Sequence, residues 1–167
     1  LQGEGANAGR SAIFCRFTGC NLWSGHEVDR ADAVCNFCDT DFVGVDGVNG
    51  GKFNKANELA ETVNKIWNTH VTNSKNKFIV CTGGEPLLQL DTKLINALHK
   101  FGFEVAIETN GTQPAPTNID WICVSPKTKV SDLVLTSGDE LKFVYPQETI
   151  QPEQFENFEF DLFYLVP

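Results

Sequence analysis

Short runs of apolar residues alternate along the chain with polar and glycine-rich segments, and this pattern predicts the secondary structure. Mostly apolar runs of the kind found in buried strands cover residues 11–17, 78–82, 103–108, 121–124, 141–145 and 158–166. Apolar residues at helical spacing predict an amphipathic helix over about 54–70. A second helix begins at Asp91, a good N-cap residue, and ends at Gly102.

The order of these elements predicts the fold class. Strand–helix–strand order favours an α/β fold with a parallel sheet, either open or curled into a partial barrel. At 167 residues the chain has the length of one domain, and it contains no linker long enough to divide it. We therefore expect residues 1–167 to form a single domain.

Four polar clusters follow predicted strands. The first is a cysteine-containing loop, and the others cover residues 82–85, 108–110 and 125–127. Because the carboxyl ends of parallel strands meet at one edge of a sheet, and ligands bind beyond that edge, we expect the four clusters to form a single active site.

Three cysteines give the first of these clusters its chemistry. Cys20 is followed by fourteen residues and then by Cys35 and Cys38 in a Cys-x-x-Cys pattern. Thiolates at this spacing favour a soft metal or an iron–sulfur cluster. A structural zinc site with His26 as a fourth ligand is the alternative. The other cysteines lie in apolar runs and are interpreted as core residues: Cys15, Cys81 and Cys123.

Two further motifs have both a functional and an ordinary interpretation. Residues 83–86, Gly-Gly-Glu-Pro, allow close approach of the backbone to a ligand, and Glu85 can accept hydrogen bonds from it, although Gly-Gly turns are common. Arg16 lies within a predicted strand, where an inward-facing arginine binds an anion such as a carboxylate. A solvated edge charge is the alternative for Arg16.

Charge and composition exclude some partners. The formal net charge is −9, which argues against a nucleic-acid or membrane surface as partner. No run of 18 apolar residues is present, and no signal peptide is visible. Six cysteines with α/β patterning are more typical of metal or redox chemistry than of disulfides, so we expect a reducing, cytoplasmic compartment.

The cysteine triad and the Gly-Gly-Glu-Pro motif together resemble the radical SAM superfamily. The usual signature is Cys-x3-Cys-x2-Cys, and this chain departs from it by the long first gap. That gap and its surroundings closely resemble the 7-carboxy-7-deazaguanine synthase family, in the subgroup with an expanded cysteine loop. The matching segments are residues 2–5, 15–23, 35–42, 82–86, 108–111, 125–127 and 141–146.

The resemblance implies a fold and a set of ligands. The fold would be a reduced, partial TIM-type barrel of about six parallel strands and three helices. Cys20, Cys35 and Cys38 would hold a 4Fe-4S cluster, and Thr40 would bind Mg²⁺. Residues at positions that bind S-adenosyl-L-methionine in the family are Phe37, Cys38, Asp39, Gly84, Glu85, Ser125, Pro126 and Lys127. Those at substrate-binding positions are Leu1, Gln2, Gly3, Arg16 and Thr82, with Arg16 pairing a pterin carboxylate.

The implied reaction is the conversion of 6-carboxy-5,6,7,8-tetrahydropterin to 7-carboxy-7-deazaguanine, with loss of ammonia, in the biosynthesis of queuosine-type 7-deazapurines. A 5′-deoxyadenosyl radical made from S-adenosyl-L-methionine would start it, and no catalytic residue is implied beyond the cluster and cofactor. An electron donor such as a flavodoxin and a homodimeric state are also implied. The family has a first strand before Leu1 and continues past Pro167, so we expect the chain to be part of a longer polypeptide.

Two rival interpretations make different predictions. A glycyl-radical activase would share the cluster and the Gly-Gly-Glu motif, but it should have compact cysteine spacing, and residues 2–5 and Arg16 argue against it. A zinc-stabilised binding module would be colourless and contain zinc, whereas a cluster protein would be brown and contain iron and labile sulfide.

Overall fold

The structure, a computed structural model, describes residues 1–71 and 76–167. Within these residues it contains six strands, two α-helices and four short 3₁₀ helices. The strands are β1 (Ile13–Phe17), β2 (Lys77–Gly83), β3 (Phe103–Thr109), β4 (Trp121–Val124), β5 (Ser137–Val144) and β6 (Glu159–Val166). The helices are α1 (Ala56–His70), α2 (Thr92–Lys100), η1 (Glu27–Asp32), η2 (Pro86–Leu88), η3 (Val130–Asp132) and η4 (Pro152–Phe155).

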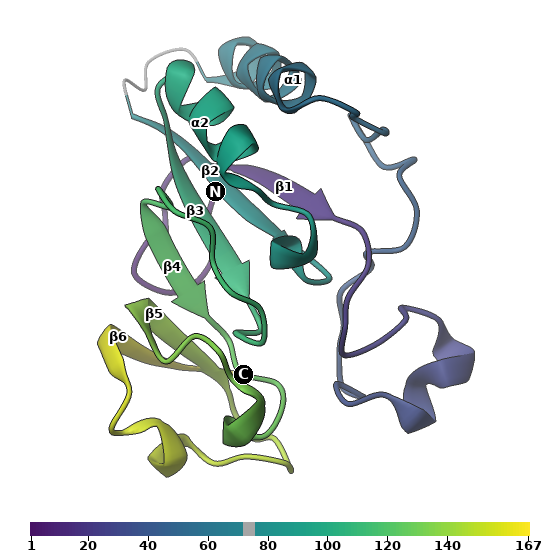
Figure 1. The fold of residues 1–167 in the computed structure, drawn as a ribbon, viewed down its shortest axis with the longest axis vertical. Helices are drawn as coiled ribbons and strands as arrows, with labels where there is room; N and C mark the ends of the chain where they lie inside the picture. The colour runs from purple at the N-terminus through teal and green to yellow at the C-terminus, as the bar shows by residue number, and fades with distance from the viewer. Residues whose placement is uncertain (72–75) are drawn as a thin grey trace.

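All six strands are parallel and lie in one sheet in the order β1-β2-β3-β4-β5-β6. The sheet is open, with β1 and β6 at its edges, and it curves so that α1 and α2 stack over the half formed by β1 to β3 (Figure 1). The predicted α/β class, with six parallel strands in a partial barrel, is confirmed. Within the described residues no helix combines the length and the apolar character that crossing a membrane requires.

The helices cover one face of the sheet because their apolar sides pack against alternate residues of the strands. Trp67 of α1 and Ile95 of α2 belong to the same buried cluster as Ile79, Val105 and Ile107 of the sheet. On β4 to β6 a second cluster around Phe143 is closed by Phe155 of η4 and by loops. Burial of this face stabilises the fold by removing apolar surface from water.

The opposite face of the sheet, here called the inner face, is polar towards the carboxyl ends of the strands. Its apolar part is a small cluster of Phe78, Val80 and Ala106. Successive residues of a strand point to opposite faces, so Thr82 and Glu108, at even spacing from these residues, lie on the inner face as well. The inner face is therefore the surface on which polar ligands can be bound.

Several predicted strand bounds differ from the structure by one or two residues, and the largest error is at the start of β5. β5 begins at Ser137 and ends at Val144, whereas the apolar pattern predicted a strand over 141–145. The early part of β5 contains polar residues that find partners only in the folded chain. Asp139 accepts a hydrogen bond from the Ile122 backbone at 2.7 Å, and Glu140 accepts one from the Ala6 backbone at 3.3 Å.

Candidate functional site

The polar clusters that follow the strands meet at one edge of the sheet, as predicted. Backbone hydrogen bonds join the loops after β1 and β2, because the Glu85 amide donates to the Gly19 carbonyl at 2.8 Å. The Ser125 amide after β4 donates to the carbonyl of Thr109 at 2.7 Å. Backbone contacts thus join the segments at these strand ends in two pairs, one after β1 and β2 and one after β3 and β4.

Glu85 organises the centre of this edge. Its side chain is fully buried, and it accepts hydrogen bonds from the Leu87 amide at 2.9 Å, the Thr109 hydroxyl at 2.8 Å and the Asn110 amide at 2.8 Å. Burial raises the pKa of Glu85, although these three donors oppose the shift. Any contribution of the Glu85 side chain to a cofactor site would therefore act through the loops that it joins.

The three cysteines of the triad lie beside this centre. The Cys20 sulfur accepts a hydrogen bond from the Leu22 amide at 3.4 Å, and the Asn110 side-chain amide lies 4.0 Å from the same sulfur. A hydrogen bond from the Cys35 thiol lowers the pKa of Cys38 to about 6. The hydrogen bond to Cys38, burial and the charges of Cys38 and Cys20 raise the pKa of Cys35, so the three thiols are within electrostatic reach of one another.

The surroundings of the triad fit thiolate ligands of an iron–sulfur cluster. Backbone amides of Leu22 and Thr40 donate to the sulfurs of Cys20 and Cys38, the kind of bond that stabilises a metal-bound thiolate. Within residues 1–71 and 76–167, no three Cys, His, Asp or Glu side chains converge closely enough to hold one metal ion. His26 is exposed to solvent, so the structure gives no support to the Cys3His zinc alternative.

The loop between Cys20 and Cys38 is held in shape by Arg30. Its guanidinium donates to the carbonyls of Asn36 and Cys38, both at 2.9 Å, and stacks over the buried ring of Trp23 at 4.2 Å. One side chain thus connects η1 to the Cys-x-x-Cys segment. The long first gap of the cysteine pattern is a structured insert.

Ser125 and Lys127 follow β4, and Lys127 is near enough to the triad for its charge to act on Cys35. Burial lowers the pKa of Lys127 to about 8, and negative charge at Cys35 and Cys38 opposes that shift. The Lys127 ammonium donates to the Ser125 hydroxyl. This buried cation is therefore placed where it can balance charge on the cysteine loop.

A second group of polar residues lies on the inner face. Glu108 accepts hydrogen bonds from the Gln2 amide at 2.8 Å, the Thr82 hydroxyl at 3.3 Å and the Lys142 ammonium at 3.1 Å. Lys142 also pairs with Glu4 at 3.3 Å. Gln2 and Thr82 were predicted substrate contacts, and the structure brings them together through Glu108.

Sequence reasoning placed Glu108 in the polar cluster of residues 108–110, but it gave no individual role to Glu4, Glu108 or Lys142. The available signal was a charged residue inside an otherwise apolar strand, at Glu108 in β3 and Lys142 in β5. Such residues are rarely buried without a partner, so they indicate a polar contact on the inner face. Their partners lie too far away in the sequence to be recognised from it.

The remaining predicted substrate residues are open to solvent. Arg16 is exposed on β1, and none of the described carboxylates forms an ion pair with it. Leu1 is 81% exposed, and Gly3 is exposed as well. Arg16 and Asp41 line a cleft of about 1030 Å³ between β1, the loop of residues 41–54 and α1.

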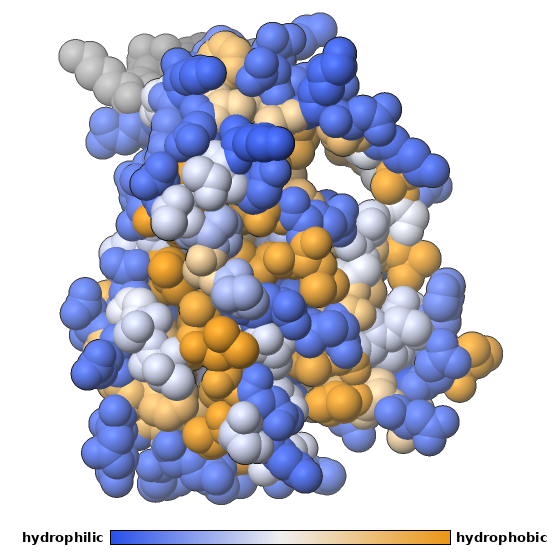
Figure 2. Space-filling model, viewed as in Figure 1, coloured by the Kyte–Doolittle hydropathy of each residue, from blue (hydrophilic) through white to orange (hydrophobic). Residues whose placement is uncertain are grey.

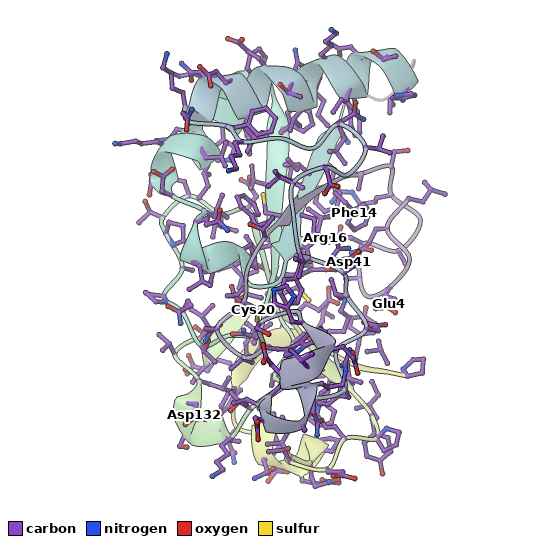
Figure 3. The ribbon with its side chains drawn as sticks, turned by 90° about the vertical axis from the view of Figure 1, so that its right-hand side faces the viewer. Glu4, Phe14, Arg16, Cys20, Asp41 and Asp132 are labelled. Atoms are coloured by element: carbon purple, nitrogen blue, oxygen red, sulfur yellow. The ribbon has the colours of Figure 1, made fainter. Side chains whose placement is uncertain are left out.

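Figure 2 shows an opening between the sheet and the chain that leads to α1, which corresponds to this cleft. In Figure 3, Arg16 lies between Phe14 and Cys20 along the height of the molecule, with Asp41 beside it and Glu4 further along the same side. The predicted anion-binding arginine is thus on the same side of the molecule as the first cysteine of the triad.

The predicted cofactor and magnesium residues have different degrees of exposure. Phe37 and Asp39 are exposed beside Cys38, and the Thr40 hydroxyl donates to an Asp39 carboxylate oxygen at 3.4 Å. Gly84 packs so closely on the Gly19 carbonyl that a side chain there would overlap it. The loop of the triad and the glycine turn after β2 therefore form one continuous surface.

An open parallel sheet whose first strand runs into a cysteine-rich loop, with glycine and polar turns at the adjoining strand ends, defines a protein of the radical SAM class. No family model matches the chain. Over all 167 residues it is 59% identical to the 7-carboxy-7-deazaguanine synthases of Caulobacter vibrioides and Bradyrhizobium diazoefficiens, and 57% identical to that of Burkholderia multivorans. In each case the match covers 78% of the relative.

These relatives show the family: the chain belongs to the 7-carboxy-7-deazaguanine synthases. A solved structure, the crystal structure of QueE from Escherichia coli, matches 99% of this chain and 80% of its own, with a TM-score of 0.64 and 20% sequence identity. At that identity the likeness concerns the fold alone.

Proposed function

We propose that the chain converts 6-carboxy-5,6,7,8-tetrahydropterin to 7-carboxy-7-deazaguanine with loss of ammonia, as a radical SAM lyase of 7-deazapurine (queuosine) biosynthesis. The observation that carries the proposal is identity of 57–59% with named synthases over the whole chain. The cysteine triad supports it, as does Arg16 near the carboxyl end of β1, with which none of the described carboxylates pairs.

Cys20, Cys35 and Cys38 would hold a 4Fe-4S cluster, because the three thiols are within electrostatic reach of one another and backbone amides donate to the sulfurs of Cys20 and Cys38. When bound, the cluster and S-adenosyl-L-methionine supply the one-electron chemistry that removes a hydrogen atom from the substrate. The residues assigned to the cofactor site, among which the buried Glu85 acts through the loops that it joins, are Phe37, Cys38, Asp39, Gly84, Glu85, Ser125, Pro126 and Lys127.

The chain's own residues bind and orient the pterin. Arg16 is exposed and pairs with none of the described carboxylates, so its guanidinium suits bidentate pairing with the pterin carboxylate. Thr82 and Gln2 place a hydroxyl and an amide on the inner face, and Leu1 and Gly3 extend that edge. Substrate held at several points reacts from one orientation, which is what a ring rearrangement requires.

Mg²⁺ would bind beside the triad. The Thr40 hydroxyl adjoins the Asp39 carboxylate, and hard cations prefer oxygen ligands of this kind. An electron donor such as a flavodoxin, a homodimeric state and a cytoplasmic location complete the proposal. They follow from the family resemblance, and size-exclusion chromatography with light scattering would test the dimer.

The test is reconstitution of the chain with iron and sulfide under anaerobic conditions. S-adenosyl-L-methionine, a reductant, Mg²⁺ and 6-carboxytetrahydropterin are added, and the products are followed by mass spectrometry. We expect 7-carboxy-7-deazaguanine, together with a brown protein that contains iron and labile sulfide. Cys38→Ala should lose both the iron and the product.

Cys15→Ala is the matched control, because Cys15 lies on β1 outside the triad and packs against the core. It should keep its iron. Formation of 5′-deoxyadenosine without the deazapurine would mean that the chain performs radical chemistry but does not act on this substrate. A colourless protein that binds zinc instead of iron would overturn the whole proposal.

A further inference from the structure

The segment before β1, residues 1–10, lies across the inner face and is held there by charged contacts. The Arg10 guanidinium forms a two-pronged pair with Glu104 of β3, at 2.7 and 2.9 Å. The backbone amide of Ala6 donates to Glu140 of β5. This N-terminal segment contains three of the proposed substrate residues, so whatever fixes its position also fixes part of the substrate site.

Lys142 is a largely buried cation that contacts this segment. Its side chain is 10% exposed, and its ammonium lies 3.1 Å from Glu108 and 3.3 Å from Glu4. Glu108 belongs to β3, Lys142 to β5 and Glu4 to the N-terminal segment. A single cation thus connects three parts of the chain at the centre of the inner face.

The charges of this group depend on one another. Burial would raise the pKa of Glu108, but Lys142 and the bonds from Gln2 and Thr82 outweigh it and hold that pKa below its ordinary value. Burial likewise opposes the charge of Lys142, yet Glu108 and Glu4 raise its pKa. Removal of the lysine would leave a half-buried carboxylate without its cation.

We propose that Lys142 is a positioning residue for the pterin substrate, an inference that rests on the proposed function. By pairing with Glu108 and Glu4 it keeps the sheet and the N-terminal segment in fixed relation. Gln2 and Thr82, which are both bonded to Glu108, are thereby held in the orientation in which they meet the substrate. Lys142 itself acts through these residues.

The experiment compares Lys142→Met with Lys142→Arg in the reconstituted chain. Lys142→Met should raise the KM for the pterin about 10- to 100-fold, the loss expected for bonds to charged groups, and change kcat much less. Lys142→Arg keeps the charge and should restore much of the lost affinity. Lys77→Met is the matched control, because Lys77 pairs with Asn64 of α1, away from the inner face, and should leave KM unchanged.

A double-mutant cycle separates positioning from direct contact. If Lys142 acts through Glu108, the double variant Lys142→Met/Glu108→Gln should have nearly the same KM as Glu108→Gln alone. Effects that multiply in the double variant would mean that Lys142 contacts the substrate independently, and would overturn the proposal.

The pH profile provides a readout that a purely structural role would not change. In Lys142→Met the pKa of Glu108 should rise, so kcat/KM should begin to fall at a higher pH than in the parent. The charged and titratable groups around Glu108 are Lys142 and Glu140 of β5, Cys123 of β4 and Glu4, and all but Lys142 remain in this variant. Lys142→Arg should retain the parent profile.

Glu4→Gln covers the case in which Lys142→Met does not fold, because the Glu4 side chain is 53% exposed and we expect its substitution to leave the fold intact. It should raise KM less than Lys142→Met. If the parent is active and KM is unchanged in Glu4→Gln and in every soluble Lys142 variant, this inference is wrong and the proposed function stands. A parent that forms no product from the pterin would overturn the proposed function and the inference with it.

Discussion

Two glutamates at the carboxyl edge of the sheet have separate tasks because their surroundings differ. Glu85 is fully buried and saturated by donors from the protein, so it joins loops. Glu108 is 22% exposed and gathers Gln2, Thr82 and Lys142 on the inner face, where a ligand can reach them. Glu85 therefore organises the loops beside the cysteine triad, and Glu108 organises the residues proposed to bind the pterin.

Gly84→Ala tests how tightly the glycine turn and the cysteine loop are joined. A β-carbon at residue 84 would overlap the Gly19 carbonyl oxygen and lie 2.9 Å from the Cys20 β-carbon. The loop must shift, so we expect a lower iron content after reconstitution and a loss of about 1–3 kcal/mol in the free energy of unfolding. Iron analysis and urea unfolding measure the two effects.

Gly47→Ala is the control for this change, because no atom lies within 4 Å of a β-carbon built there. Its iron content should equal that of the parent. Full iron loading in Gly84→Ala would show that the cysteine loop does not depend on this contact.

At the scale of elements, β1 leads into the cysteine loop, and α1 and α2 cover one face of β1 to β3. The two α-helices begin differently. α2 has a capped start, since Asp91 accepts a hydrogen bond from the Leu94 amide at 2.9 Å. The N-cap residue of α1 is Lys55, whose side chain forms no capping hydrogen bond.

This difference predicts opposite effects of two substitutions. Asp91→Ala should lower the free energy of unfolding by about 1 kcal/mol, because it removes the cap of α2. Lys55→Ser should raise it by several tenths to about 1 kcal/mol, because a serine there would form a capping box with Glu58. The exposed ion pair between Lys55 and Glu58 that is lost contributes little.

Urea unfolding midpoints of the two variants and the parent provide the measurement. A Lys55→Ser variant that is less stable than the parent would mean that α1 is fixed by its packing alone. Unchanged activity in both variants is expected, because neither Asp91 nor Lys55 belongs to the residues proposed to bind the cluster, the cofactor or the substrate.

At the scale of the whole molecule, the parallel order β1 to β6 brings all strand ends to one edge, and charged pairs link distant parts of the chain across it. The pair of Glu108 and Lys142 is the most buried of these links. Because the pKa of Glu108 is lowered in the folded state, its contribution to stability is present above its ordinary pKa of 4.5 and is lost as pH falls through the folded value. Because the pKa of Lys142 is raised in the folded state, its contribution to stability is present below its ordinary pKa of 10.5 and is lost only as pH rises through the folded value.

The parent should therefore lose more unfolding free energy between about pH 7 and about pH 3.5 than the double variant Lys142→Met/Glu108→Gln, which lacks the pair. Urea unfolding at a series of pH values measures the difference. Equal slopes in the two proteins would show that the pair does not contribute to stability in this range.

The periodicity of apolar residues was sufficient to predict most of the fold. β4 has the predicted bounds, the Asp91 cap is present, and the polar turns after β2, β3 and β4 meet the cysteine loop. The prediction failed at the start of β5, because the polar residues there resemble a loop until Ile122 and Ala6 supply their partners. The roles of the site residues stay predictions.

The sequence by itself determined the elements, their parallel order and the three thiols, because these depend on local patterns and on spacing along the chain. Only the tertiary structure decided which charges meet. Glu108, Lys142 and Glu4 are separated by long stretches of chain, and their contacts follow from strand register and from the path of the N-terminal segment. Pairing between distant buried charges leaves no periodic signal, since each residue alone is compatible with a solvated position.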